Sequence, residues 1–518
     1  MTAEPAQIAA PRGARRLLLF AAFLCAICGF AYELVIIALG TVLFGSSTEQ
    51  TALVLGTFVA SMGIGSWIGG RVPDRLAIQT FVALEALVAL LGGLSALALF
   101  SAYAWLDLYE VAVRSLSVVL GLLVGAEIPL LASIVQRVRA ERTSQTVGTL
   151  LAADYVGAFA IGVTFPVLIL PNTGHIVSAL AFGALNAAGG ALVLWLMRAR
   201  LARAARAVLA ASLVAATVVL LAVGVVADDI EASARQALYD DPIVHHDQTR
   251  YQEIDLTRSL DGRDLRLFLN GDLQFSSVDE YRYHEALVHP ALAGPRSRVL
   301  LLGAGDGLAL REVLRYRDVR EVVLVELDPA MLELARENDD LRRLNGDALS
   351  DPRVRTVAAD AFTWARRAVE RFDAVIVDLP DPDDDALAKV YSREFYEILR
   401  SRVLSPGGRI AVQAGSPYFA PEAFWCVERT LHAAGLRTRP YHVDVPSFGD
   451  WGFVLAGAGS GSAPRLELRP PERLRFLDAP TLAAAATFPP DRRSARVRPS
   501  TLDRPSIVSY ARRGYQDE

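Results

Sequence analysis

Cysteine is scarce in this sequence, and its placement predicts no disulfide framework. Three cysteines occur among 518 residues. Cys25 and Cys28 lie one helical turn apart inside an apolar stretch, and Cys426 stands alone. A C-x-x-C redox or metal site needs polar, accessible thiolates. We therefore interpret Cys25 and Cys28 as small side chains packed inside a membrane helix.

An excess of positive charge is also absent. The formal net charge is −5 at pH 7, with 52 Lys and Arg against 57 Asp and Glu. Proteins that bind nucleic acid normally carry a clear basic excess, because they neutralise backbone phosphates. The composition therefore predicts no nucleic-acid partner.

Charge of either sign is rare between residues 17 and 227, whereas the rest of the chain resembles an ordinary soluble protein. Apolar runs long enough to cross ~30 Å of hydrocarbon recur in this part. The first is too long, and too polar at its end, to be only a cleavable signal peptide. We expect seven membrane spans, at 17–40, 51–70, 78–102, 116–136, 147–170, 175–197 and 207–227. They predict a multi-pass protein of the cell membrane, with the lipid bilayer as a partner.

The placement of arginine predicts how these spans are oriented. Arginines gather before the first span and in alternate loops: Arg12, Arg15, Arg16, Arg71, Arg75, Arg137, Arg139, Arg142, Arg198, Arg200, Arg203 and Arg206. The positive-inside rule therefore places the N-terminal segment, residues 1–16, in the cytoplasm. Seven spans would put the soluble half on the opposite face, whereas one re-entrant segment would keep it in the cytoplasm. The side of the soluble half stays open at this point.

Four acidic residues lie inside the predicted spans: Glu33, Glu85, Glu127 and Asp154. Acids inside a membrane are costly and commonly mark a functional site, such as one that binds or passes a cation. The alternative is an acid that pairs with a hydroxyl of a neighbouring helix or lies near a water-filled end. The sequence leaves both interpretations open, and with them the question of transport.

The chain beyond residue 240 changes to soluble patterns. Period-two alternation with Asp-Gly and Asn-Gly turns predicts a small β-hairpin domain at 240–285. Strand and helix patterns then alternate over 286–458, which predicts a Rossmann-like α/β domain with a mostly parallel sheet. Residues 459–475 are rich in Gly, Ser and Pro, so 459–518 is expected to be a linker and a segment that packs back. The membrane domain would span 17–230.

A glycine-rich turn follows the first strand of this α/β domain. Gly303, Gly305 and Gly307 form a G-x-G-x-G pattern, and such glycines let the backbone approach a ligand. The pattern favours an S-adenosyl nucleoside over a dinucleotide, because no pyrophosphate has to be bound. Glu326 ends the second strand, where an acid accepts hydrogen bonds from ribose hydroxyls. Asp360 ends the third strand and is placed for the exocyclic amine of adenine.

More acids follow than a nucleoside needs. Asp306 lies inside the glycine turn, and the fourth strand, "FDAVIVDLPDPDDDA", ends in Asp378 and Asp381. S-adenosylmethionine carries a carboxylate that would favour basic groups here. Decarboxylated S-adenosylmethionine and a diamine, which are cations, suit the acids better. A carboxylate base would remove a proton from the amine before it attacks the carbon next to sulfur.

The soluble half resembles the spermidine synthases, or polyamine aminopropyltransferases, and in particular their membrane-fused bacterial branch. The resemblance runs from Tyr251 to Tyr510 and rests on "RYQEI", "LNGDLQFSSVDEYRYHEALVHPAL", "LLGAGDGLALRE", "VELD", "AADAF", "VDLPDP" and "YSREFYEILRSRVLSPGG". The apolar half looks like the membrane domain of that branch, in "YELV", "GAEIPLL" and "DYVGAFAIGVTFPVLILPNTG".

This resemblance implies a fold, an activity and a set of site residues. The fold is that of class I methyltransferases, and the activity converts decarboxylated S-adenosylmethionine and putrescine into spermidine and 5′-methylthioadenosine. No metal and no further cofactor is implied, and the chain would form a homo-oligomer, a dimer or tetramer. Asp378 would be the catalytic base, and Asp381 would hold the diamine. The nucleoside would contact Gln252, Glu326, Asp360 and Ala361 beside Gly303 and Gly305, and the aminopropyl and amine groups would lie among Tyr283, His284 and Asp306.

The chain departs from the family pattern on the amine side. Ala304 and Leu308 stand where the family usually has glycine, and Phe448 replaces a common tyrosine. Asp384 and Asp385 stand in place of a Gly-Pro pair, and we interpret residues 383–385 as a solvated lid. These changes leave the nucleoside site intact and the identity of the amine open.

Two other functions are compatible with the sequence. One is an S-adenosylmethionine-dependent methyltransferase on the same fold, although Asp306, Asp378 and Asp381 argue against it. The other is a membrane polyamine transporter or sensor whose soluble half binds without catalysis, a possibility motivated by the intramembrane acids.

Overall fold

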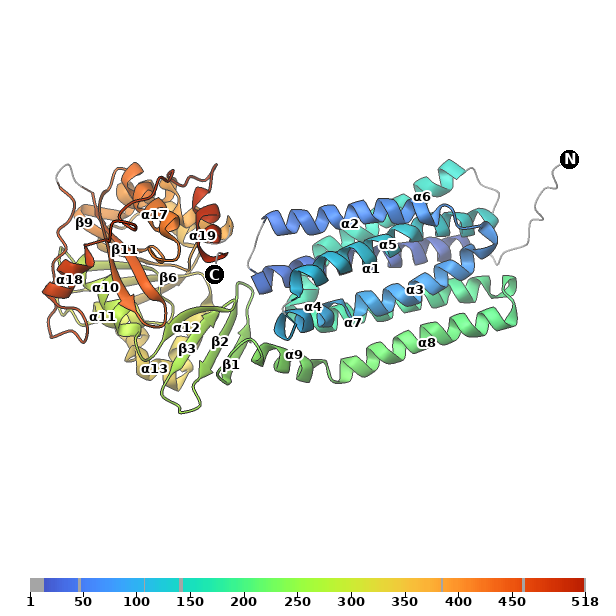
Figure 1. Ribbon diagram of the computed structural model, residues 1–518, viewed down its shortest axis with the longest axis horizontal. Helices are drawn as coiled ribbons and strands as arrows, with labels where there is room; N and C mark the ends of the chain where they lie inside the picture. Colours follow the sequence, from blue (N-terminus) through green and yellow to red (C-terminus); the bar gives the residue numbers. More distant parts are fainter. Residues whose placement is uncertain are drawn as a thin grey trace. The chain divides into compact units, whose positions relative to one another are not determined.

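The computed structural model describes residues 14–44, 48–106, 108–138, 143–382, 385–458 and 462–516. Most of the predicted cytoplasmic segment lies outside these ranges, and so do Asp383 and Asp384 of the predicted lid. The chain divides into two compact units, Met1–Asp240 and Asp241–Glu518 (Figure 1). Each unit is described below by itself.

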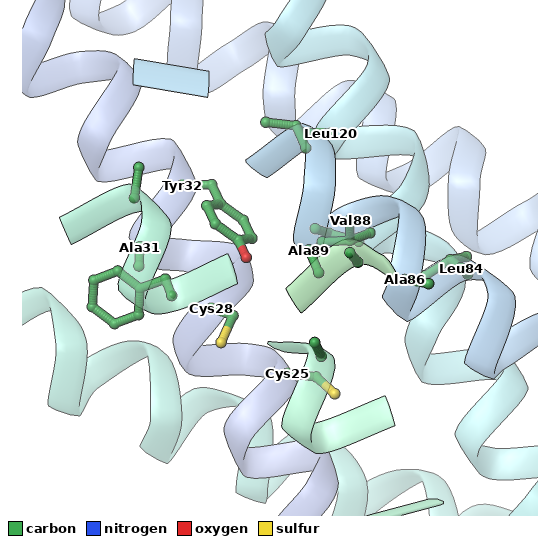
Figure 2. Packing of buried hydrophobic residues seen from close by; sticks show 14 of the residues in the cluster. Cys25, Cys28, Ala31, Tyr32, Leu84, Ala86, Val88, Ala89 and Leu120 are labelled. Atoms are coloured by element: carbon green, nitrogen blue, oxygen red, sulfur yellow. The ribbon is translucent and has the colours of Figure 1, made fainter. Parts of the chain in front are cut away.

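The described part of the first unit is helical, as its apolar, alanine- and leucine-rich sequence predicts. Its helices are α1 (Ala14–Phe44), α2 (Thr48–Gly69), α3 (Ala77–Gly93), α4 (Ser95–Ala104), α5 (Tyr109–Val138), α6 (Thr143–Thr164), α7 (Leu170–Met197), α8 (Arg203–Val225) and α9 (Ala227–Gln236). Small residues bring some of them close together: a side chain added at Gly65 of α2 would collide with the backbone of Leu122 in α5. Figure 2 shows buried apolar side chains of the unit around Cys25, Cys28 and Tyr32.

The number of long apolar helices differs from the seven spans expected. Among the described residues, six helices are long and apolar enough to cross a membrane: 16–40, 51–69, 74–104, 109–136, 147–200 and 203–225. The fifth is 54 residues long because α6 and α7 are joined through a π-helical turn at Phe165–Ile169. Gly174, with φ 68° and ψ −178°, interrupts the helical backbone between the predicted spans 147–170 and 175–197. Insertion in a membrane and the number of crossings stay predictions.

The second unit begins with a four-stranded antiparallel sheet. Its strands, β1 (Ile243–Gln248), β2 (Glu253–Arg258), β3 (Leu265–Leu269) and β4 (Asp272–Ser276), follow one another in sequence order. Asn270 and Gly271 form the turn between β3 and β4 with φ of 52° and 88°, values that asparagine and glycine tolerate best. All four strands fall inside the predicted hairpin region.

A seven-stranded sheet follows, and the predicted α/β domain is confirmed. The spatial order is β10 (Arg437–Val445), β11 (Gly449–Gly457), β9 (Leu404–Gln413), β8 (Phe372–Asp378), β5 (Arg298–Gly303), β6 (Glu321–Glu326) and β7 (Val354–Ala358). The sheet is mixed, because β5 to β9 run parallel whereas β11 pairs antiparallel with both β9 and β10. The central parallel strands β5, β6 and β8 are buried on both faces. On β5, Leu301 packs in one hydrophobic core and Leu300 and Leu302 pack in the other.

Helices cover this sheet and position the site. They are α10 (Glu280–Leu292), α11 (Leu308–Leu314), α12 (Pro329–Glu337), α13 (Asp339–Asn345), α14 (Ala361–Arg367), α15 (Asp385–Ala388), α16 (Arg393–Ile398), α17 (Pro421–Ala433), α18 (Ala479–Ala485) and α19 (Ser506–Gln516). The C-terminal α19 buries Ile507, Val508 and Ala511 in the core that contains Val412 of β9. The strand order reverses at β5, with β6 on one side and β8 on the other, and ligands of open α/β sheets bind beside such a point.

Candidate active site

The glycine turn lies between β5 and α11, directly beside the end of β8. Gly303 pairs with Asp378 in the sheet, and a side chain at Gly303 would collide with the Asp378 carbonyl. A Cβ at Gly305 would lie 2.8 Å from Glu326 Oε2. Ala304 has φ 62°, a left-handed conformation that costs a non-glycine residue about 1–2 kcal/mol. The turn therefore approaches both acids closely, and the alanine found in place of the family's glycine adopts a strained backbone.

The residues predicted to bind a nucleoside surround the ends of β6 and β7. Glu326 Oε1 accepts a hydrogen bond from the Asp328 amide at 3.1 Å. Burial is the main reason that the pKa of Glu326 is raised to about 7, although amide hydrogen bonds from residues 327 and 328 oppose it. The turn containing Gln252 reaches the same strand end, because Thr249 donates to Asp328 Oδ2 at 2.7 Å and accepts from the Gln252 amide at 3.0 Å.

Asp360 has two partners that the sequence did not predict. Its Oδ1 caps α14 by accepting from the Thr363 amide at 2.8 Å, and its Oδ2 pairs with Lys389 Nζ at 2.7 Å. Burial alone would raise the pKa of Asp360, but Lys389 and the Thr363 hydrogen bonds hold it below its ordinary value. Ala361, the next residue, begins α14 and is buried. An adenine amine at Asp360 would therefore share the carboxylate with the only lysine of the chain.

Three of the predicted amine-side residues meet around Asp378. The Tyr283 hydroxyl donates to Asp378 Oδ1 at 2.6 Å. Burial raises the pKa of Asp378 to about 6, and the charge of Asp306 adds to this, while His284 and the Tyr283 hydrogen bond lower it. Asp306 accepts from the Leu308 amide at 2.8 Å, and burial raises its pKa as well.

His284 is held by an acid on the same helix. Its Nδ1 lies 2.9 Å from Glu280 Oε2, and Arg311 fixes the two Glu280 oxygens at 3.0 and 2.9 Å. Burial alone would lower the pKa of His284, but Glu280 together with Asp306 and Asp378 raises it to about 8. A protonated His284 therefore supplies positive charge among these acids, and it partly offsets their mutual repulsion.

Asp381 is held by two residues that the sequence did not single out. Gln413, at the end of β9, donates to Asp381 Oδ1 at 3.1 Å, and the Tyr515 hydroxyl donates to Oδ2 at 3.0 Å. Burial raises the pKa of Asp381 against these two hydrogen bonds. Gln413 could have been found from its place at a strand end on the same sheet edge. Tyr515 could not, because only the packing of α19 brings it to Asp381.

Asp385, the described member of the predicted lid, is exposed at the start of α15. Phe448 belongs to an aromatic wall beside Tyr283, with ring centroids 6.1 Å apart. Trp451 and Phe453 complete this wall at 6.5 and 5.2 Å from the Tyr283 ring. The wall fixes the ring whose hydroxyl contacts Asp378.

These features are typical of a nucleoside-dependent transferase: a glycine turn, an acid at the end of the next strand, and further half-buried acids beyond them. Residues 280–462 match the family described as the spermine/spermidine synthase domain. The chain is 51% identical to polyamine aminopropyltransferase 1 of Streptomyces coelicolor over 98% of this chain and 96% of that protein. It is 44% identical to the polyamine aminopropyltransferase of Mycobacterium tuberculosis H37Rv, over 97% of each chain. The chain thus belongs to the polyamine aminopropyltransferase family, as the sequence motifs predict.

A solved structure is also similar to part of this chain. It is a spermidine synthase in complex with the transition-state analogue AdoDATO, 26% identical, with a TM-score of 0.43 over 48% of this chain and 85% of that one. The similarity to the bacterial relatives extends over nearly the whole chain, so those relatives share the helical unit as well.

Proposed function

We propose that this aminopropyltransferase moves the aminopropyl group of decarboxylated S-adenosylmethionine to putrescine, forming spermidine and 5′-methylthioadenosine. The observation that carries the choice of substrates is the group of half-buried acids, Asp306, Asp378 and Asp381, at one edge of the sheet, where desolvation raises the pKa of each. Cationic substrates lower the free energy of such a group, whereas a substrate carboxylate would raise it.

The nucleoside would bind over the glycine turn. Glu326 would accept hydrogen bonds from the ribose hydroxyls, because its Oε2 borders the space beside Gly305. Gln252 and Ala361 would contact the same nucleoside, and Asp360 its adenine amine. The sulfonium and the aminopropyl chain would then extend toward Asp306 and Asp378.

Proton removal is the task proposed for Asp378. An amine with an ordinary pKa near ~10 is mostly protonated at neutral pH and cannot attack until it loses a proton. Asp378, with a pKa of about 6, is a stronger base than an ordinary aspartate and is still ionised at pH 7. The deprotonated nitrogen forms a bond to the carbon next to sulfur, the carbon–sulfur bond breaks, and its electron pair stays on the neutral thioether. The product nitrogen stays protonated as a secondary ammonium, and the single proton taken up by Asp378 is then released to solvent.

Asp381 is proposed to bind the second ammonium group of the diamine. Gln413 and Tyr515 orient its two oxygens, one each, so the carboxylate has a fixed direction before the amine arrives. A diamine held between Asp381 and Asp378 would present one nitrogen to the base, and this positioning lowers the entropic part of the barrier.

The helical unit is proposed to anchor this enzyme in the cell membrane, since six of its described helices have the required length and hydropathy. A homo-oligomer is proposed on the family resemblance. Both statements are independent of the chemistry at Asp378.

Calorimetry on the full-length protein in detergent should separate the two nucleosides. Decarboxylated S-adenosylmethionine should bind at least about tenfold more tightly than S-adenosylmethionine, because the carboxylate of the latter would face Asp306 and Asp378. Addition of putrescine should then yield 5′-methylthioadenosine, measured by chromatography. Tighter binding of S-adenosylmethionine would favour the methyltransferase alternative, and binding without product would favour a non-catalytic sensor.

Replacing Tyr515 with phenylalanine should raise KM for putrescine by about tenfold, because a hydrogen bond to a charged group is worth about 1.5–3 kcal/mol. Binding of decarboxylated S-adenosylmethionine should change little, since the Tyr515 hydroxyl donates to Asp381, on the proposed amine side of the site. Tyr510→Phe is the matched control: it lies on the same helix, and its hydroxyl accepts from the Arg498 amide at 3.2 Å. Equal KM values for the two variants would remove Tyr515 from the amine site.

A further inference from the structure

The helical unit contains a group of buried polar side chains that aminopropyl transfer does not use. Cys25 of α1, Glu85 of α3 and Glu127 of α5 are all buried, and one ligand atom of each lies within 4.8 Å of the other two. Asn186 of α7 joins them, because its Nδ2 donates to Glu85 Oε2 at 2.7 Å and to the Glu85 carbonyl at 3.1 Å. Four helices thus contribute one polar side chain each to the same region of the bundle.

Two oxygens of this group have no hydrogen-bond partner within the described part of the chain: Glu127 Oε1 and Asn186 Oδ1. The two residues are only 3% and 1% exposed. Glu85 differs, since Oε1 accepts from Cys25 Sγ at 3.4 Å and Oε2 accepts from Asn186. A buried acceptor without a donor costs about 1–3 kcal/mol, and more when it is charged. These oxygens therefore call for a ligand that is positively charged or donates hydrogen bonds.

The surroundings of the group are apolar and tightly packed. Cys25 and Cys28 of α1 belong to a buried apolar cluster that includes Ala86 and Val88, and Figure 2 shows these side chains. Glycines bring α7 close, because a Cβ at Gly190 would lie 2.8 Å from Glu85 Cβ and one at Gly189 would lie 3.8 Å from Cys25 Sγ. A small ligand suits such a place better than an extended organic cation.

The donor set identifies the kind of ligand. Zn²⁺ binds sulfur at ~2.3 Å and oxygen at ~2.0–2.2 Å, so atoms within 4.8 Å of one another can reach one ion after small movements. A dication offsets most of the negative charge of two carboxylates and a thiolate, a charge that is costly to bury without a cation. The sulfur atom favours a transition metal over Mg²⁺ or Ca²⁺, whose ligands are oxygens. Carboxylates on facing helices of a bundle are a known way to build metal sites.

We propose that Cys25, Glu85 and Glu127, with Asn186 Oδ1 as a fourth ligand, bind a divalent transition-metal ion of the Zn²⁺ type inside the helical unit. Binding displaces the Cys25 thiol proton, so the metal replaces the Cys25–Glu85 hydrogen bond. Asn186 keeps its bond to the Glu85 carbonyl and turns its unpartnered oxygen to the ion. This site is separate from the proposed transfer chemistry, and its test does not depend on that chemistry.

The metal content of the purified full-length protein tests the site. The protein in detergent is loaded with ZnCl₂, freed of excess ion and analysed by inductively coupled plasma mass spectrometry. We expect about one Zn²⁺ per chain, as four ligands around one tetrahedral ion imply. Cys25→Ser and Glu127→Gln should each lose most of this zinc. Cys28→Ser is the matched control, because Cys28 is equally buried on the same helix but is not part of the group.

Loading with Co²⁺ tests the thiol without relying on a variant to fold. A thiolate-to-cobalt absorption band should appear in the unmodified protein and in Cys28→Ser, and it should be missing in Cys25→Ser. The proposal is overturned by an unmodified protein that takes up no metal or shows no such band. It is equally overturned by a Cys25→Ser protein that, as a monodisperse species, retains as much zinc as Cys28→Ser.

Discussion

Asp378→Asn is expected to lower kcat for 5′-methylthioadenosine formation by about 10²–10⁴-fold, the usual contribution of a general base. Asparagine has nearly the same shape and can still accept the Tyr283 hydrogen bond, which measures 2.6 Å to Asp378. It cannot take a proton from the amine, so the nucleophile stays protonated at neutral pH. Binding of decarboxylated S-adenosylmethionine, measured by calorimetry, should change much less than kcat.

The chain offers a matched control on the same strand. Asp373 lies at the opposite end of β8, where its Oδ2 accepts from the Arg298 amide at 3.1 Å. Asp373→Asn removes a carboxylate from β8 without touching the site, so it should leave kcat near that of the unmodified enzyme. If Asp378→Asn were as active as Asp373→Asn, Asp378 would not be the base.

The pH profile gives an independent measure of the same base. The pKa of Asp378 is raised to about 6 by burial, so the carboxylate is ionised above that pH and protonated below it. Only the ionised form accepts a proton. The unmodified enzyme should therefore lose kcat/KM as the pH falls through about 6, and Asp378→Asn should lose this dependence.

The acids of the site could be predicted from the sequence because a sheet topology gathers them. Glu326 ends β6 and Asp378 ends β8, the two strands that flank β5. The three strands are parallel, so their carboxyl ends lie at one edge of the sheet. The glycine turn is a local signal and was also predictable. The partners of Asp360 and Asp381 were not, since Lys389 and Tyr515 approach through tertiary packing that no local pattern encodes.

The helical unit shows a second limit. Hydropathy marks apolar segments, but it does not tell whether consecutive segments are separate helices or one helix with an interruption. The sequence predicts spans that end at 170 and start at 175, and in the structure residues 147–200 form one long apolar run whose helical backbone is interrupted at Gly174, between the two predicted spans. The antiparallel strands β10 and β11 were not predicted either. Alternating strands and helices predict parallel strands, and no helix separates β10 from β11.

Asp381→Asn is expected to raise KM for putrescine by about 10²- to 10³-fold or more, because a buried ammonium that loses its carboxylate partner costs about 3–5 kcal/mol. The effect on kcat should be smaller, since Asp378 and Tyr283 are unchanged. Asp385→Asn is the matched control for a neighbouring acid, because Asp385 is exposed on α15 and is interpreted as part of a lid. Steady-state kinetics with putrescine as the varied substrate measure both variants, and equal KM values would contradict the proposed role of Asp381.

The double variant decides how Tyr515 acts. If the Tyr515 hydroxyl serves only to orient Asp381, Tyr515→Phe should add less than about twofold to KM once Asp381 is already asparagine, because residues that act through one contact are not additive. In the unmodified enzyme the same substitution should cost about tenfold. Additive effects would mean that Tyr515 binds the amine directly. In that case α19 would supply a binding residue of its own instead of a support for Asp381.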